Sequence, residues 1–179
     1  MSADGVAGRQ PQLHATARHP WLTELGDGLR LFDLPWGRLA VVVGDDALLP
    51  ESFRLAVVAD ADVVAVPHSP SEPWEYRLGL PERAAENRLN VVSAGFDADG
   101  AFRAGCFALS PDFTLWTSWQ GPFTGVISHP EVGAATAGQR WLRGVVRPAQ
   151  AVNRQVSKGT DLVGGRPRRP LAATTTGTE

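Results

Sequence analysis

Cysteine is almost absent from this chain of 179 residues, which contains one, Cys106. A single thiol excludes an intramolecular disulfide, and it excludes a structural zinc site built from several cysteines. Lysine is equally scarce, because Lys158 is the only lysine among 17 cationic side chains. The formal net charge is −2, so no basic excess indicates nucleic acid or an anionic membrane as a partner.

Long apolar runs are also missing. No run of 18 apolar residues occurs, so no membrane span is expected. The first residues, MSADGVAGRQPQ, lack the apolar core of a signal peptide, and we therefore expect a soluble, cytoplasmic protein. Apolar residues make up 43% of the chain and charged residues 20%, which is the balance of one ordinary globular domain.

The two ends of the chain lack hydrophobic periodicity. Residues 1–11 are small and polar, and we expect a flexible leader there. Residues 164–179 are rich in Gly, Pro and Thr, and we expect them to form a disordered tail. The sequence therefore predicts a single domain over residues 12–163.

Apolar runs alternate with helical patterns between these ends. Residues 29–34 alternate weakly before a turn, and strands are predicted at residues 38–43, 62–67, 90–95, 102–110 and 115–119. Helices are predicted at residues 50–60, 74–90 and, more briefly, 148–155. Pro50 suits a first helical turn, whereas Pro81 must either kink its helix or begin it. This order predicts an α/β fold in which helices cover buried strands.

Five segments carry a resemblance to a known family. They are GRLAVVV at residues 37–43, PESFR at 50–54, ADVVAVP at 61–67, RAAEN at 83–87 and GCFALSP at 105–111. In this order and spacing they resemble the nitrilase superfamily of carbon–nitrogen hydrolases. The resemblance covers roughly residues 12–125, and it implies an incomplete nitrilase-like α-β-β-α sandwich that lacks its N-terminal part.

The resemblance also implies catalytic groups that this chain does not retain. The family uses a cysteine nucleophile, a glutamate base and a lysine that stabilises the oxyanion. Aligned on PESFR, the cysteine position falls on Gly44, and Asp46 keeps the aspartate of the family's C-x-D pattern. The family's K-x-H is best matched at Gln12 to His14, so glutamine replaces the lysine. A second glutamate would fall near His19 or on Glu24, and the strand of the first glutamate is not in this sequence.

The acidic residues near these positions allow more than one interpretation. By resemblance, Glu86 helps to form the pocket floor, whereas a helix-end ion pair of Glu86 with Arg83, or with a residue outside this segment, is an equally good interpretation. Asp45, Asp46 and Glu51 form an acidic cluster, but the family pattern explains Asp46 and Glu51 as turn and helix-start residues, so we expect no metal and no cofactor. The pocket-lining positions implied by the resemblance are Asp45, Asp46, Glu51, Glu86 and Asn87.

The remaining candidates for chemistry favour structural roles. Cys106 lies in a predicted strand, and we expect a small core residue rather than a nucleophile. The four histidines have no metal-ligand spacing and are expected to be solvated or structural: His14, His19, His68 and His129.

We interpret the chain as a catalytically inactive nitrilase-like protein, a pseudoenzyme that acts as a structural or regulatory partner. Its expected partner is a second copy or a related nitrilase-fold chain. The alternative is a hydrolase of amide or nitrile carbon–nitrogen bonds, with rearranged catalytic residues or completed by a partner chain. A third interpretation is a start site upstream of this sequence or a decaying gene.

Overall fold

The computed structural model describes residues 5–108, 131–152 and 174–176. In this part of the chain, one mixed sheet of seven strands has the order β6-β5-β4-β3-β2-β1-β7. The strands are β1 (Leu29–Leu34), β2 (Gly37–Val41), β3 (Val63–Pro67), β4 (Asn90–Phe96), β5 (Phe102–Ala108), β6 (Glu131–Ala134) and β7 (Thr174–Thr176). The helices are α1 (Pro50–Val58) and α2 (Leu80–Asn87), with shorter helical turns η1 (Gly44–Leu48), η2 (Glu75–Gly79) and η3 (Pro148–Val152).

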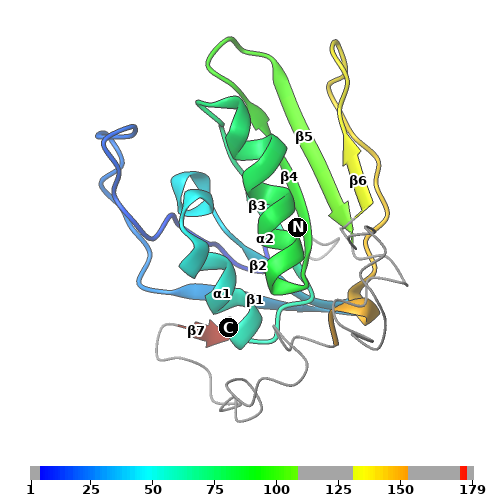
Figure 1. Ribbon diagram of the computed structural model, residues 1–179. Helices are drawn as coiled ribbons and strands as arrows, with labels where there is room; N and C mark the ends of the chain where they lie inside the picture. The colour runs from blue at the N-terminus through cyan, green and yellow to red at the C-terminus, as the bar shows by residue number, and fades with distance from the viewer. Residues whose placement is uncertain (1–4, 109–130, 153–173, 177–179) are drawn as a thin grey trace, which may run out of the picture.

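The centre of the sheet is parallel. β3 pairs in parallel with β2 on one side and with β4 on the other, and the two connections run through α1 and α2. Both helices lie on the same face of the sheet (Figure 1). β1 and β5 extend the sheet on either side as antiparallel neighbours of β2 and β4. The predicted order of strand, helix, strand, helix, strand, strand is therefore present from β2 to β5.

The two prolines act at helix starts. Pro50 occupies the first turn of α1, where its missing N–H costs no hydrogen bond. Pro81 lies in the first turn of α2, directly after the wider π-helical turn of η2, so it begins the α-helix rather than kinking one. Arg88 then ends α2 in the left-handed conformation, with φ of 52°. The predicted helix at residues 74–90 is thus η2 followed by α2.

The hydrophobic core lies between the sheet and the two helices. α1 contributes Phe53, Ala56 and Val57, which are buried against strand residues such as Val64 and Val66. The apolar, β-branched runs that predicted these strands supply that contact surface. The described residues thus form one helical layer on one sheet, which confirms the α/β class and corresponds to half of an α-β-β-α sandwich.

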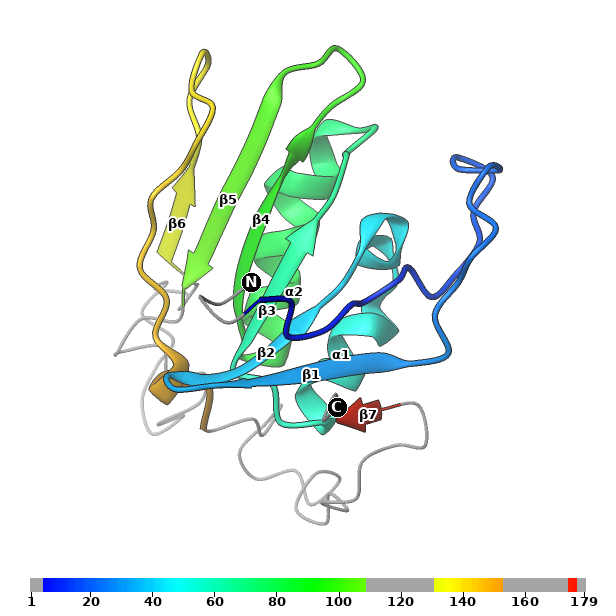
Figure 2. The same ribbon diagram turned by 180° about the vertical axis from the view of Figure 1, so that it is seen from behind.

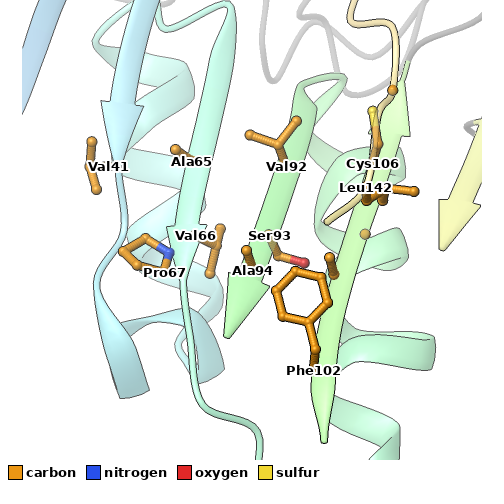
Figure 3. Close-up of a pocket in the computed structure, with 13 residues that line it drawn as sticks. Val41, Ala65, Val66, Pro67, Val92, Ser93, Ala94, Phe102, Cys106 and Leu142 are labelled. Atoms are coloured by element: carbon orange, nitrogen blue, oxygen red, sulfur yellow. The ribbon is translucent and has the colours of Figure 1, made fainter. Parts of the chain in front are cut away.

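The other face of the sheet is mainly apolar from β2 to β5. A groove of about 550 Å³ runs along it, and Figure 3 shows Val41, Ala65, Val92 and Cys106 at its wall. Leu142 and Gly144, which follow β6, line the same groove. Within the described residues, both α-helices lie on the opposite face (Figure 2).

Several expectations concern the ends of the domain. The predicted strand at 115–119 and His129 lie outside the described residues, as do 109–110 of the strand predicted at 102–110. The helix predicted at 148–155 is the short 3-10 turn η3 as far as Val152. In the stretch expected to be a tail, β7 pairs in parallel with β1. In the expected leader, the side-chain oxygen of Gln10 accepts a hydrogen bond from the Arg30 amide at 2.6 Å. The leader and the tail otherwise stay predictions. No helix among the described residues is long and apolar enough to cross a membrane.

Candidate functional site

The turn that follows β2 contains Gly44, which the resemblance places at the family's nucleophile position. Gly44 begins η1 with a φ of +59°, a left-handed conformation that glycine adopts without steric cost. The carbonyl of Gly44 lies 3.2 Å from Nδ1 of His68, which follows β3. The turn therefore sits beside the carboxyl end of the neighbouring parallel strand, where α/β proteins commonly place their sites.

Gln12 packs directly against Gly44. A Cβ atom built on Gly44 would collide with the side-chain oxygen of Gln12. Gln12 is buried, and its amide nitrogen donates to the carbonyl of His14 at 2.6 Å, which fixes the side chain in this position. Gly44 and Gln12, the two positions at which the resemblance expects catalytic residues, are therefore neighbours in space.

Asp46 binds the backbone next to Gln12 and so holds this segment against the turn that begins at Gly44. Its carboxylate accepts hydrogen bonds from the amides of Leu13 and His14, at 2.6 and 3.0 Å. Nδ1 of His14 lies 2.8 Å from the same carboxylate. Asp46 is 1% exposed, so these donors replace the water that a carboxylate would otherwise bind.

Asp45 is buried next to Asp46 and takes a different set of donors. Thr16 donates its hydroxyl to Asp45 at 2.5 Å, and Nδ1 of His19 lies 3.2 Å from the same oxygen. Arg18 lies 3.7 Å from the second carboxylate oxygen. We call residues 12–28, which lead into β1, the N-terminal arm. The arm is drawn in blue in Figure 2. All three of these donors come from the arm.

Sequence reasoning missed Glu75, which is the third buried carboxylate among the described residues. Glu75 accepts hydrogen bonds from the amides of Ser71 and Glu72 and pairs with Arg18 at 2.9 Å. Nε2 of His68 lies 3.0 Å from its carboxylate. The available signal was weak, since a glutamate in a predicted first helical turn is ordinary and His68 was expected to be solvated or structural.

Burial lowers the pKa of His68, and the surrounding charges act in both directions. The carboxylates of Glu75 and Asp45 oppose the effect of burial, whereas Arg18 and His19 add to it. A neutral imidazole donates through one nitrogen only, so the neutral ring donates either to Glu75 or to the Gly44 carbonyl.

The lowered pKa of His68 predicts how stability depends on pH. The unfolded chain keeps this histidine near its ordinary pKa of 6.5, so below pH 6.5 it binds a proton that the folded protein resists. We expect this contribution to the free energy of unfolding to be complete above pH 6.5 and to be lost as the pH falls. Urea denaturation at a series of pH values, compared between the wild type and His68→Gln, measures it. A steeper loss of stability in His68→Gln than in the wild type would show the opposite sign.

The other predicted pocket residues lie on the helices. Glu51, Glu86 and Asn87 line a separate cleft of about 330 Å³ between α1 and α2, together with Pro50 and Arg54. Arg83 pairs with Glu86, which is the helix-end ion pair considered from the sequence. Among the described residues, these three make no contact with the polar groups around Gly44. Their role in a pocket floor stays a prediction.

Cys106 is a buried residue of β5. Its Sγ atom lies 3.8 Å from the carbonyl of Val145, and burial raises the pKa of the thiol. A thiol with a raised pKa is a poor nucleophile, because the thiolate is the reactive form. Within the part of the chain that the structure describes, no group of three or more His, Cys, Asp or Glu side chains is arranged to hold a metal ion.

Known proteins include relatives of this chain that are similar to it in sequence. The chain is 35% identical over 91 residues to a nitrilase from Pyrococcus abyssi, a match that covers 50% of this chain and 34% of that protein. It is 31% identical over 97 residues to a probable hydrolase, YhcX, from Bacillus subtilis, which covers 51% of this chain and 19% of that protein. No protein-family model matches the chain.

Solved structures of amidases show a looser similarity. The NitN amidase from Nesterenkonia sp. AN1 superposes with a TM-score of 0.46 and 21% identity over 56% of this chain and 41% of that one. A second structure, of an amidase from Nesterenkonia sp., gives a TM-score of 0.45 and 22% identity over 55% of this chain and 40% of that one.

The two sequence relatives, together with the ordered motifs, support a partial nitrilase-like domain over about half of this chain. The matches span about a third of the length of the first curated relative and about a fifth of the second.

Proposed function

We propose that this chain is a catalytically inactive member of its family that acts as a structural or regulatory partner. One observation supports the proposal: at Gly44, which the resemblance places at the nucleophile position, the side chain of Gln12 fills the space into which a side chain would project. The position at Gly44 therefore has no thiol, and the side chain of Gln12 also occupies the space that a thiol side chain would need.

Both substitutions remove chemistry that the family's reaction requires. A covalent mechanism needs an attacking atom, and glycine supplies none, so the route is lost rather than slowed. By the resemblance, Gln12 stands where a lysine would stabilise the oxyanion. An amide can donate a hydrogen bond, but it carries no charge to place against a developing negative charge.

The proposed partner is a second copy of this chain or a related nitrilase-fold chain. The apolar groove on the sheet face away from the helices is compatible with such an association. Size-exclusion chromatography with light scattering tests this part of the proposal, and a monomer that captures no related chain would contradict it. A cytoplasmic location stays a prediction from the sequence.

The inactive state predicts no turnover by the purified full chain. We expect no hydrolysis of amides, nitriles or N-carbamoyl compounds above the rate without protein, measured as ammonia release. Gly44→Cys alone should not restore it, because Gln12 stays uncharged and occupies the same space. Turnover by the wild type that Asp45→Ala removes, and that Cys106→Ala leaves unchanged, would overturn this proposal.

That outcome would favour the second candidate, a hydrolase with rearranged catalytic groups. Asp45 supports it, because the buried carboxylate holds Nδ1 of His19 at 3.2 Å and the hydroxyl of Thr16 at 2.5 Å. A carboxylate that orients a histidine is the supporting half of an acid–base arrangement. Loss of turnover in both Asp45→Ala and His19→Gln would support this candidate.

A further inference from the structure

A small hollow lies on the helical side of β5 and β6, apart from the Gly44 turn. Its volume is about 250 Å³. The strands supply small residues there, Gly105 and Ala134, which are paired across the two strands. Larger rings stand at its edges, Phe107 from β5 and Tyr76 from η2. The ring of Phe107 lies over Gly105, so the small side chain of Ala134 is what leaves the hollow open on the β6 side.

Two guanidinium groups line this hollow. Arg103 lies over the ring of Tyr76, with 5.4 Å between the guanidinium carbon and the ring centroid. Arg77 approaches the same ring at 5.6 Å. The side chain of Tyr76 is held in position because it packs against the hydrophobic core. The lining contains no acidic side chain among the described residues.

Arg103 is fixed before any ligand binds. Its Nε donates to Asp97 at 2.7 Å. Asp97 is fixed in turn, since its other oxygen accepts the amides of Asp99 and Ala101 at 3.1 and 2.9 Å. The Ala101 amide, aided by Arg103, lowers the pKa of Asp97, so this carboxylate stays charged at neutral pH. Among the described residues, the hydrogen bond of Arg103 to Asp97 uses Nε, and its two terminal nitrogens have no hydrogen-bond acceptor.

Arg77 adds an unbalanced positive charge. Within the described part of the chain, no carboxylate pairs with it, whereas Asp97 already offsets Arg103. A planar guanidinium binds a planar carboxylate through two parallel hydrogen bonds. The apolar walls and the aromatic ring suit a compact apolar group next to that charge.

We propose that this hollow binds a small organic carboxylate with a compact apolar or aromatic body. The carboxylate pairs with Arg103 and Arg77, and the body lies among Tyr76, Phe107 and the small residues of β5 and β6. The volume excludes a drug-sized ligand, since pockets for such molecules begin at about 300 Å³. This site is independent of the proposed function and of the Gly44 turn.

The experiment measures binding of benzoate to the full chain by isothermal titration calorimetry and by NMR shift changes. We expect saturable binding with a dissociation constant on the order of millimolar, as befits a ligand of few atoms. Benzyl alcohol supplies the ring without the charge, and inorganic phosphate supplies a charge without the ring. Both should bind about tenfold more weakly or not at all.

Three variants locate the site. Arg77→Gln should weaken benzoate binding by about tenfold. Arg103→Lys keeps the charge but loses the planar fork, and it should weaken binding similarly. Ala134→Leu fills the hollow without altering a charge and should abolish binding. Arg38→Gln removes an exposed arginine that pairs with Asp33 elsewhere on the sheet, and it should bind as the wild type does.

Each contrary result would reject a different part of the proposed carboxylate site. Equal binding of benzoate and benzyl alcohol would overturn the role of the two arginines. Binding that survives Ala134→Leu would place the ligand elsewhere. Either result leaves the proposed inactivity untouched, because neither depends on Gly44 or Gln12.

Discussion

Gly44→Ala should lower the free energy of unfolding by about 1–3 kcal/mol, more than an alanine substitution at a positive-φ glycine whose Cβ would meet open space. Two causes combine at this position. A side chain at φ of +59° is strained, and its Cβ collides with the side-chain oxygen of Gln12. Urea denaturation followed by circular dichroism measures the change.

A matched control separates the two causes. Gly100 also has a positive φ, of +73°, but a Cβ there meets no atom within 4 Å. Gly100→Ala should therefore report backbone strain alone, at about 1 kcal/mol. In a double-mutant cycle, Gln12→Ala should relieve part of the cost of Gly44→Ala. If Gly44→Ala costs no more than Gly100→Ala, and Gln12→Ala does not change that cost, then Gln12 does not fill the space next to Gly44.

Glu75→Ala should be the most damaging single substitution in the polar network, with a loss of about 3–5 kcal/mol. The substitution removes the acceptor of Arg18 and of the amides of Ser71 and Glu72, and it also removes the carboxylate next to Nε2 of His68. Such a loss is a large part of the stability of about 5–15 kcal/mol that folded domains have. Urea denaturation again gives the value.

Nearby residues provide the controls for Glu75. Glu72→Ala changes an exposed carboxylate three residues away and should alter stability by no more than about 0.5 kcal/mol. Glu75→Gln keeps the size of the side chain and part of its acceptor capacity, so it should fall between the two. Equal stability of Glu75→Ala and Glu72→Ala would mean that the buried network does not hold the fold.

The elements of the fold were predictable because their signals are local. The apolar run at residues 62–67 became β3, and Pro81 limited the choice at α2 to a kink or a start. The pairing of β7 with β1 was not predictable, because a run of three threonines in a stretch rich in glycine and proline has no amphipathic pattern.

The candidate site was predictable only in part. The family spacing pointed to Gly44 and Gln12, and the structure brings these two residues together. The pairing of His68 with Glu75 depends on where a loop and a helical turn meet in space, and no sequence period encodes that meeting. The approach of Arg103 to Tyr76 joins residues from β5 and η2, and it too arises only in the folded chain.

The hydrogen bonds and ion pairs that attach the N-terminal arm affect how the protein unfolds. The carboxylates of Asp45 and Asp46 receive their donors from residues 13–19, and Arg18 also reaches Glu75. If the arm detached while the rest of the protein stayed folded, these carboxylates would lose their hydrogen-bond donors. The free energy of that partly unfolded state should approach the free energy of global unfolding. The amide protons of residues 13 and 14 should therefore exchange with solvent as slowly as those of the core, although they belong to a segment without regular secondary structure.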